Sequence, residues 1–170
     1  MGILLNKPKS PIGRNGKKKY HQGFYEIKNP DKYIGDPTKC IYRSSWELKF
    51  MMYLDFEPNI KKWGCEVMTI PYQDEKGKFH RYYPDFYIEV IGADPEKCER
   101  IVAEIKPYKE TQQPTPPEKQ TAKTLESFEY QAKTYQKNLY KWTRSIDFCK
   151  KNGLKFWIIT EKFLKEKGIL

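Results

Sequence analysis

The sequence predicts an α/β fold in which a mixed β-sheet is flanked by helices, and three features of the 170-residue chain indicate it. A helix-start signal near residue 44 precedes a series of short apolar segments. A long segment with helical periodicity, residues 125–151, follows them. A single apolar strand, residues 154–160, and a short helix from Glu161 end the chain. This order of a helix, three or four strands, a helix, a strand and a helix is typical of an α/β sandwich.

The first helix begins at a capping signal. Ser44 is followed three residues later by Glu47, which is the spacing of a capping box. Pro58 ends the helix, because proline removes a backbone donor. The apolar residues at helical spacing are Trp46, Phe50, Tyr53 and Leu54.

Short strand candidates follow the helix. They are residues 60–63, 67–72, 79–83, 84–91 and 101–106. A polar turn around Gly77 joins the second candidate to the third. The fourth candidate alternates, so that Asp85 and Phe86 face opposite sides of the sheet. Pro107 ends the fifth.

The long helix has two distinct faces. Its apolar residues recur at steps of three and four and are expected to face the core. They are Phe128, Ala132, Tyr135, Leu139, Trp142, Ile146 and Cys149. A separate basic stripe, which is either a solvated face or a DNA contact, consists of Lys133, Lys137, Lys141 and Arg144.

The charge of the chain favours a polyanionic partner. The net charge is +10, and residues 1–40 hold nine Lys and Arg against three Asp and Glu. Prolines and glycines interrupt this segment, so we expect residues 1–40 to form a basic extended arm and residues 41–170 to form the folded domain. A basic chain rich in aromatic residues suits DNA. No apolar run approaches the roughly 20 residues that cross a bilayer, so no membrane partner and an intracellular protein are expected.

Three side chains are candidates for chemistry. Glu104 and Lys106 are two residues apart in one strand, so they leave the same face of the sheet. Asp85 lies 19 residues before Glu104, at the start of the preceding strand. If these two strands pair, two carboxylates and one ammonium meet at one edge of the sheet.

Two clustered carboxylates repel each other unless a cation lies between them, and oxygen ligands favour Mg²⁺, or Mn²⁺ in its place. The backbone carbonyl of Ile105 would complete the ligand set. A divalent ion activates water and neutralises charge on a phosphate, so the sequence predicts a metal-dependent DNA endonuclease, with Lys106 orienting the water or holding a phosphate oxygen.

The tripeptide alone carries little weight. An acid two residues before a lysine occurs four times in the chain, and only the one at Glu104 lies in a clearly apolar strand after a Pro-Asp strand entry. On the residues alone, a surface salt-bridge cluster remains an equal alternative. Glu47 is a fourth candidate, as a metal ligand, although its spacing favours the capping role.

Five segments together resemble a known family. They are YRSSWELKF at 42–50, PNI at 58–60, IPY at 70–72, HRYYPDFYI at 80–88 and AEIKP at 103–107. In this order they resemble the head completion nucleases of T4-like bacteriophages. More broadly they resemble the TnsA-type endonuclease domain of the PD-(D/E)xK superfamily. The resemblance covers roughly residues 20–165.

The resemblance implies a restriction-endonuclease-like αβββαβ core and assigns residues 41–170 to the nuclease domain. It implies that Glu47, Asp85, Glu104 and Lys106 are catalytic, which reverses the preference for a pure cap at Glu47. The TnsA branch can carry Gln at the position of Glu104, so Glu here leaves the metal site fuller. The implied partners are double-stranded DNA and the phage portal or neck proteins, and the implied location is the host cytoplasm and the virion.

DNA contacts are expected from the basic arm, from Arg43 before the first helix and from the polar side of the long helix. The candidates are Lys17, Lys18, Lys19, Arg43, Gln131, Lys133, Lys137 and Lys141. No base-reading module is evident, so contacts to phosphates are expected. The oligomeric state is not encoded in these patterns.

Two other functions stay open. The chain could be a non-catalytic head-completion or DNA-end-binding protein with a vestigial nuclease fold. It could also be a TnsA-like transposon or restriction endonuclease subunit, with the same chemistry in another biological setting.

Overall fold

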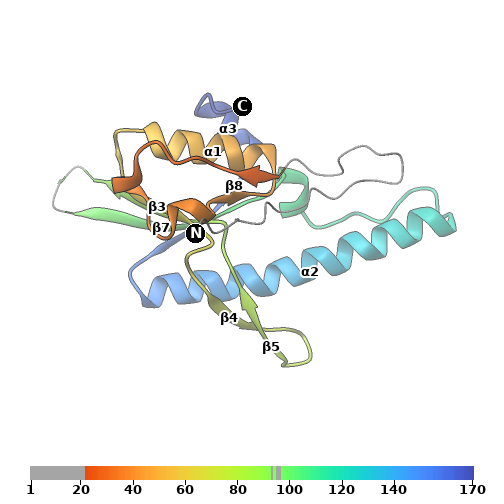
Figure 1. The fold of residues 1–170 in the computed structure, drawn as a ribbon. Helices are drawn as coiled ribbons and strands as arrows, with labels where there is room; N and C mark the ends of the chain where they lie inside the picture. The colour runs from red at the N-terminus through yellow and green to blue at the C-terminus, as the bar shows by residue number, and fades with distance from the viewer. Residues whose placement is uncertain (1–21, 93, 95–96) are drawn as a thin grey trace, which may run out of the picture.

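A four-stranded sheet with helices on both faces forms the centre of the computed structural model, which describes residues 22–92, 94 and 97–170. Its strands are β3 (Ile60–Cys65), β6 (Phe86–Ile91), β7 (Cys98–Ile105) and β8 (Lys155–Ile159). Helix α1 (Ser45–Phe56) lies on one face and α2 (Ala122–Lys151) on the other, as Figure 1 shows. The short α3 (Glu161–Glu166) follows β8 on the α1 side (Figure 1).

The sheet is mixed. Its order is β3-β6-β7-β8, with the first two pairings antiparallel and β7–β8 parallel. Helix α2 makes the crossover that a parallel pair requires. The order α1, β3, β6, β7, α2, β8 confirms the predicted α/β fold with its αβββαβ core.

Alternation along the central strands separates two cores. Phe86, Ile88 and Ile101 face α1 in a cluster with Phe50 and Leu54. Val102 belongs to a second cluster, formed with α2 and the β4–β5 hairpin; its buried members are Ile70, Tyr72, Tyr82, Val102 and Cys149. Since Glu104 lies two residues after Val102, the alternation brings it to this second face.

Two of the predicted strands lie outside the central sheet. β4 (Ile70–Gln73) and β5 (Phe79–Tyr82) form a hairpin of their own, which projects past α2 in Figure 1. Gly77 in its turn has φ of 74°, a conformation that glycine adopts without strain. The hairpin presents Tyr72 and Tyr82 to α2 and thus places Tyr82 above the sheet.

The described part of the expected N-terminal arm is packed on the core. β1 (Gly23–Phe24) pairs with β2 (Ile41–Tyr42), and short 3-10 helices, Pro30–Lys32 and Pro37–Lys39, lie between them. The hydroxyl of Tyr25 donates a 2.8 Å hydrogen bond to the buried carboxylate of Asp55. The candidates Lys17, Lys18 and Lys19 lie outside the described residues.

The predicted core face of α2 needs one correction. Trp142 and Cys149 are buried as expected, but Ile146 is 53% exposed and Ser145 is buried in its stead. The buried positions of this half, which include Asn138, follow steps of four, three and four residues, and Ile146 falls one step, about 100°, outside that stripe. In the described part of the chain, no helix is both long and apolar enough to span a membrane.

Candidate active site

Asp85 and Glu104 lie opposite each other at one end of the sheet. Phe86 pairs with Ala103 in the antiparallel β6–β7 ladder, so the next pair of positions is Asp85 and Glu104. Side chains that are directly opposite leave the same face, with Cβ atoms about 4.5–5.5 Å apart. The register therefore brings together the two carboxylates that the sequence singled out.

The carboxylate of Asp85 is fixed by the backbone of β7. Its Oδ2 accepts a 2.7 Å hydrogen bond from the amide of Ile105, while its own carbonyl accepts one of 3.1 Å from the amide of Glu66. Burial and repulsion by Glu104 raise the pKa of Asp85 well above its ordinary value. The site thus holds unfavourable negative charge that a cation would relieve.

Glu104 is the most enclosed of the site carboxylates. It is 4% exposed, and its Oε2 accepts a 2.7 Å hydrogen bond from the hydroxyl of Tyr82. Its Oε1 lies 3.2 Å from Nζ of Lys106. Burial alone would lower the pKa of Lys106, but attraction by Glu104 and Asp85 raises it above the ordinary value. Lys106 therefore stays charged beside the carboxylate pair.

The donor set at this edge consists of oxygen atoms. The amide of Ile105 points toward Asp85, and the carbonyl of an extended residue points to the same side of its strand as the amide. Asp85, Glu104 and this carbonyl suit a hard cation such as Mg²⁺. Proteins often bind Mg²⁺ through one or two carboxylates, and the ion keeps several of its water ligands. Among the described residues, no three His, Cys, Asp or Glu side chains gather into a metal-binding group.

Glu47 lies at the N-terminus of α1 and is engaged in the helix cap. Its carboxylate accepts 2.7 Å and 2.9 Å hydrogen bonds from the amide of Arg43 and the hydroxyl of Ser44. Ser44 in turn accepts from the amide of Glu47. Burial raises the pKa of Glu47, and its charge contributes to the raised pKa of Asp85. The residue is thus both a capping group and an electrostatic neighbour of the site.

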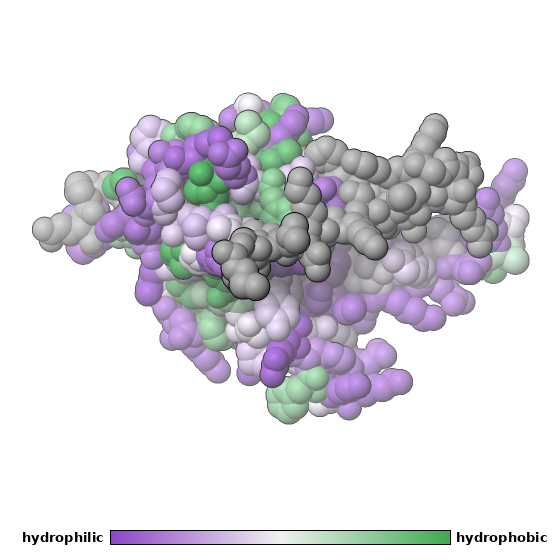
Figure 2. Space-filling view, viewed as in Figure 1, coloured by the Kyte–Doolittle hydropathy of each residue, from purple (hydrophilic) through white to green (hydrophobic). Residues whose placement is uncertain are grey.

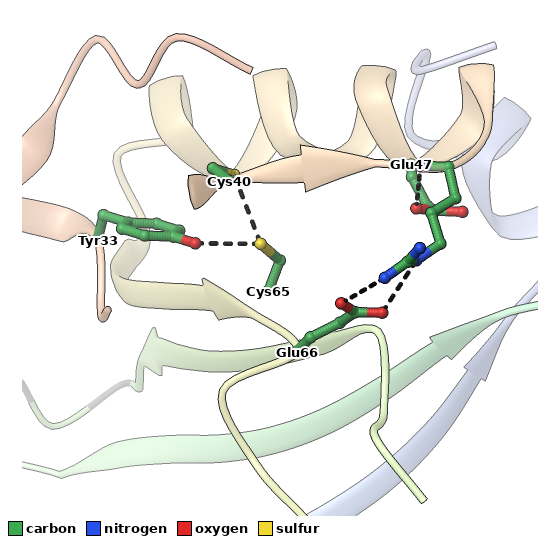
Figure 3. A network of polar contacts seen from close by, with 6 residues as sticks. Tyr33, Cys40, Glu47, Cys65 and Glu66 are labelled. Carbon is green, nitrogen blue, oxygen red and sulfur yellow. Dashed lines mark hydrogen bonds and ion pairs between the residues drawn. The ribbon is translucent and has the colours of Figure 1, made fainter. Parts of the chain in front are cut away.

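Arg43 bridges the start of α1 to the end of β3. Its guanidinium forms two hydrogen bonds, of 3.1 and 2.9 Å, with the carboxylate of Glu66, whose side chain lies below Glu47 in Figure 3. Glu66 has φ of 49°, an unusual conformation for a residue with a side chain. The amide of Glu66 also donates to the backbone carbonyl of Asp85, so this ion pair helps to hold the backbone at Asp85 in place.

Helix α2 brings one further cation to the site. Nζ of Lys141 lies 5.0 Å from the centroid of the Tyr82 ring, and its charge interacts with Glu104 and Asp85. The sequence made Lys141 a candidate DNA contact in a basic stripe, without placing it beside the carboxylates, and gave Tyr82 no role. The available sequence signal was that Tyr82 lies only three residues before Asp85. This spacing does not show that the hairpin of Tyr82 lies outside the central sheet, so the position of Tyr82 could not be derived from it.

The other α2 candidates lie farther along the helix. Gln131 lines a hollow of about 320 Å³ beside the 3-10 helix η3 (Tyr108–Thr111). Lys133 and Lys137 line one of about 540 Å³ between α2 and the β4–β5 hairpin. Hydrophilic side chains follow α2 along the lower side of the molecule in Figure 2. Neither hollow is lined by Asp85, Glu104 or Lys106.

Comparison with known proteins gives two matches. The family model described as TnsA-like endonuclease N terminal matches residues 57–161. This span contains Asp85, Glu104, Lys106 and Lys141, and it begins after Glu47. The protein named Head completion nuclease, of Enterobacteria phage T4, is 37% identical over 149 residues, which are 87% of this chain and 96% of that protein. No solved structure matches.

Proposed function

This chain belongs to the TnsA-like endonuclease family, and from that premise we propose that it is a metal-dependent DNA endonuclease of phage head completion. The observation that carries the proposal is the opposition of Asp85 and Glu104 across the β6–β7 ladder, with Lys106 3.2 Å from Glu104. The name of the T4 relative supports a nuclease role in head completion. Double-stranded DNA as the substrate and the portal or neck proteins as partners are part of the proposal.

The metal ligands of the proposal are Asp85, Glu104 and the carbonyl of Ile105, with Glu47 binding directly or through water. Mg²⁺ is the proposed ion, and Mn²⁺ is expected to substitute. When bound, the ion would lower the pKa of a water molecule and offset negative charge on the phosphate. The fit rests on the oxygen donors and on the raised pKa of Asp85.

The protein residues hold and orient the reacting groups. The amide of Ile105 fixes Asp85, and Tyr82 fixes Glu104, so both carboxylates are held in one orientation. Lys106 is placed to orient the water or to hold a phosphate oxygen. In hydrolysis the water oxygen bonds to phosphorus while the bond from phosphorus to the leaving sugar oxygen breaks.

Cleavage of plasmid and linear DNA with Mg²⁺ or Mn²⁺, and its absence with a chelator, tests the proposal. Asp85→Ala and Lys106→Ala are expected to abolish cutting. Glu89→Ala is the matched control, because Glu89 is an acid on the same face of β6 that bonds Tyr87 instead. Folded protein that cuts no DNA with either ion contradicts the proposal.

Complementation distinguishes an active endonuclease from a non-catalytic head-completion protein. In T4 that lacks its Head completion nuclease, wild-type chain is expected to restore infectious particles and Asp85→Asn is not. Restoration by Asp85→Asn would favour a structural head-completion protein. The gene neighbours distinguish a head-completion protein from a transposon or restriction endonuclease subunit. Capsid and tail genes nearby favour the former, and transposase genes favour the latter.

A further inference from the structure

The ammonium of Lys141 is half-buried and has no ion-pair partner among the described residues. No salt bridge joins it to any residue between 22 and 170 that the structure describes. Its charge is attracted by Glu104 and repelled by Lys106 at longer range. Burial lowers the pKa of Lys141, and attraction by Glu104 only partly opposes this. A charge that is taken out of water is costly unless a partner compensates it. The position therefore suits an anion that arrives with the substrate.

The ring of Tyr82 fixes where this cation lies. Nζ of Lys141 is 5.0 Å from the ring centroid, within the range of a cation–π contact. The hydroxyl of the same ring bonds Glu104, so one aromatic side chain is a common support for the cation and the carboxylate. The ammonium consequently has a set position beside the proposed centre of cleavage.

A second polar group accompanies Lys141 on α2. Asn138 lies three residues earlier and so shares its face of the helix. Asn138 is only 7% exposed, and none of the described residues forms a hydrogen bond with its side-chain amide. Buried amides are normally hydrogen-bonded, so this one is also available to a ligand oxygen.

We propose that Lys141 binds a phosphate of the DNA backbone at the cleavage site, from the α2 side, with the amide of Asn138 as an accessory donor. Lys106 then approaches the substrate from the sheet and Lys141 from the helix. A phosphate oxygen accepts from an ammonium in a charge-assisted hydrogen bond, and it fits between two cations that otherwise repel. The proposal rests on the proposed function, because it requires DNA as the substrate.

The test measures binding and not turnover. Binding of a short DNA duplex by Lys141→Met is followed over a range of salt concentrations without divalent ions. Loss of one phosphate contact is expected to reduce the slope of log K against log salt by about 0.9. Lys141→Arg is expected to keep the slope, and Lys150→Met is the charge-matched control, because Lys150 is exposed at the far end of the same helix.

Asn138→Ala is expected to weaken binding without changing the slope, because the amide is neutral. In cleavage assays Lys141→Met is expected to raise KM about 10-fold or more. Circular dichroism establishes that each variant is folded, and Lys141→Gln replaces Lys141→Met if the latter unfolds. A slope for folded Lys141→Met that equals the wild-type slope overturns the assignment. If the wild type also binds and cuts no DNA, the proposed function itself has failed; if it cuts normally, only this inference has.

Discussion

The hydroxyl of Tyr82 donates a 2.7 Å hydrogen bond to Oε2 of Glu104, and both side chains are almost wholly buried. The two residues come from different sheets, since Tyr82 belongs to the β4–β5 hairpin and Glu104 to the central sheet. Burial and the charge of Glu104 raise the pKa of Tyr82, so its hydroxyl remains a donor. The hairpin thus holds the orientation of a proposed metal ligand.

Tyr82→Phe should therefore reduce cleavage while leaving the fold intact. The substitution removes the donor to Glu104 but keeps the ring under Lys141. Loss of a group that orients a metal ligand typically costs about 10- to 100-fold in metal affinity or activity. Initial cleavage rates over a titration of Mn²⁺ measure both effects.

Tyr87→Phe is the matched control, because Tyr87 donates a similar hydrogen bond of 2.9 Å to Glu89, an acid that is opposite Arg100 and not Glu104 in the β6–β7 ladder. It should leave the cleavage rate near that of the wild type. Equal losses of activity in the two variants would mean that Tyr82 has no special link to the site.

Asp85→Asn should stabilise the metal-free protein in a pH-dependent manner. The folded-state pKa of Asp85 is raised, so between the unfolded value of about 3.9 and the folded value the native state binds more protons than the unfolded state. Stability consequently falls as pH rises through this window, and the loss is complete above the folded pKa. The gain in Tm from Asp85→Asn should be small at pH 4 and larger at pH 7.

Divalent ions and a second acid provide the controls for this stability effect. Mn²⁺ should raise the Tm of the wild type and not that of Asp85→Asn, since binding to the native state stabilises it. Asp74 has the opposite sign, because its hydrogen bond with His80 lowers its pKa. Asp74→Asn should not stabilise the protein at pH 7. A higher Tm in Asp74→Asn than in Asp85→Asn would contradict the electrostatic account.

Much of the fold and part of the candidate site could be predicted because local patterns encode them. The Pro-Asp strand entry and the strand around Glu104 fix which residues face the same side, and pairing of consecutive strands then brings Asp85 to Glu104. The capping signal at Ser44 located the start of α1 to the residue.

The contributions of Tyr82 and Lys141 could not be predicted, because they depend on tertiary placement. Alternation in β5 shows that Tyr82 is buried, but not that its hairpin leaves the central sheet and folds over it. Lys141 follows the polar side of a helical pattern, and only its position over the Tyr82 ring shows that its long side chain reaches the site. Ile146 was wrongly placed in the core because apolar spacing alone cannot locate the centre of the buried stripe.

The partly buried thiol of Cys65 should be more reactive than the buried thiols of Cys40 and Cys149. Its sulfur is 3.5 Å from that of Cys40 and 3.0 Å from the hydroxyl of Tyr33. Dashed lines mark both contacts in Figure 3. Hydrogen bonding with Cys40 lowers the pKa of Cys65 to about 7, against the opposing effect of burial, and Tyr33 adds to the lowering. Because the thiolate is the nucleophile, alkylation of Cys65 should rise through an inflection near pH 7.

Mass spectrometry of each cysteine peptide after iodoacetamide treatment measures this reactivity. Burial raises the pKa of Cys149 to about 11, so Cys149 should stay unmodified at pH 8. Tyr33→Phe should move the inflection of Cys65 to higher pH. An unchanged inflection in Tyr33→Phe would show that the tyrosine does not stabilise the thiolate.

Ser44→Ala and Glu47→Gln should separate the two roles of Glu47. Ser44 accepts from the amide of Glu47 and also donates to its carboxylate, so Ser44→Ala should lower the free energy of unfolding by about 1 kcal/mol. It should reduce cleavage less than Glu47→Gln does, because the amide of Arg43 still holds the charged carboxylate. Glu47→Gln keeps an oxygen that can accept from the amide of Arg43 but removes the charge near Asp85. With Glu47 as a metal ligand, Glu47→Gln should reduce the cleavage rate strongly while it changes the free energy of unfolding little. Denaturant unfolding and cleavage rates of both variants decide the matter, because parallel losses in the two would mean that Glu47 acts only through the helix cap.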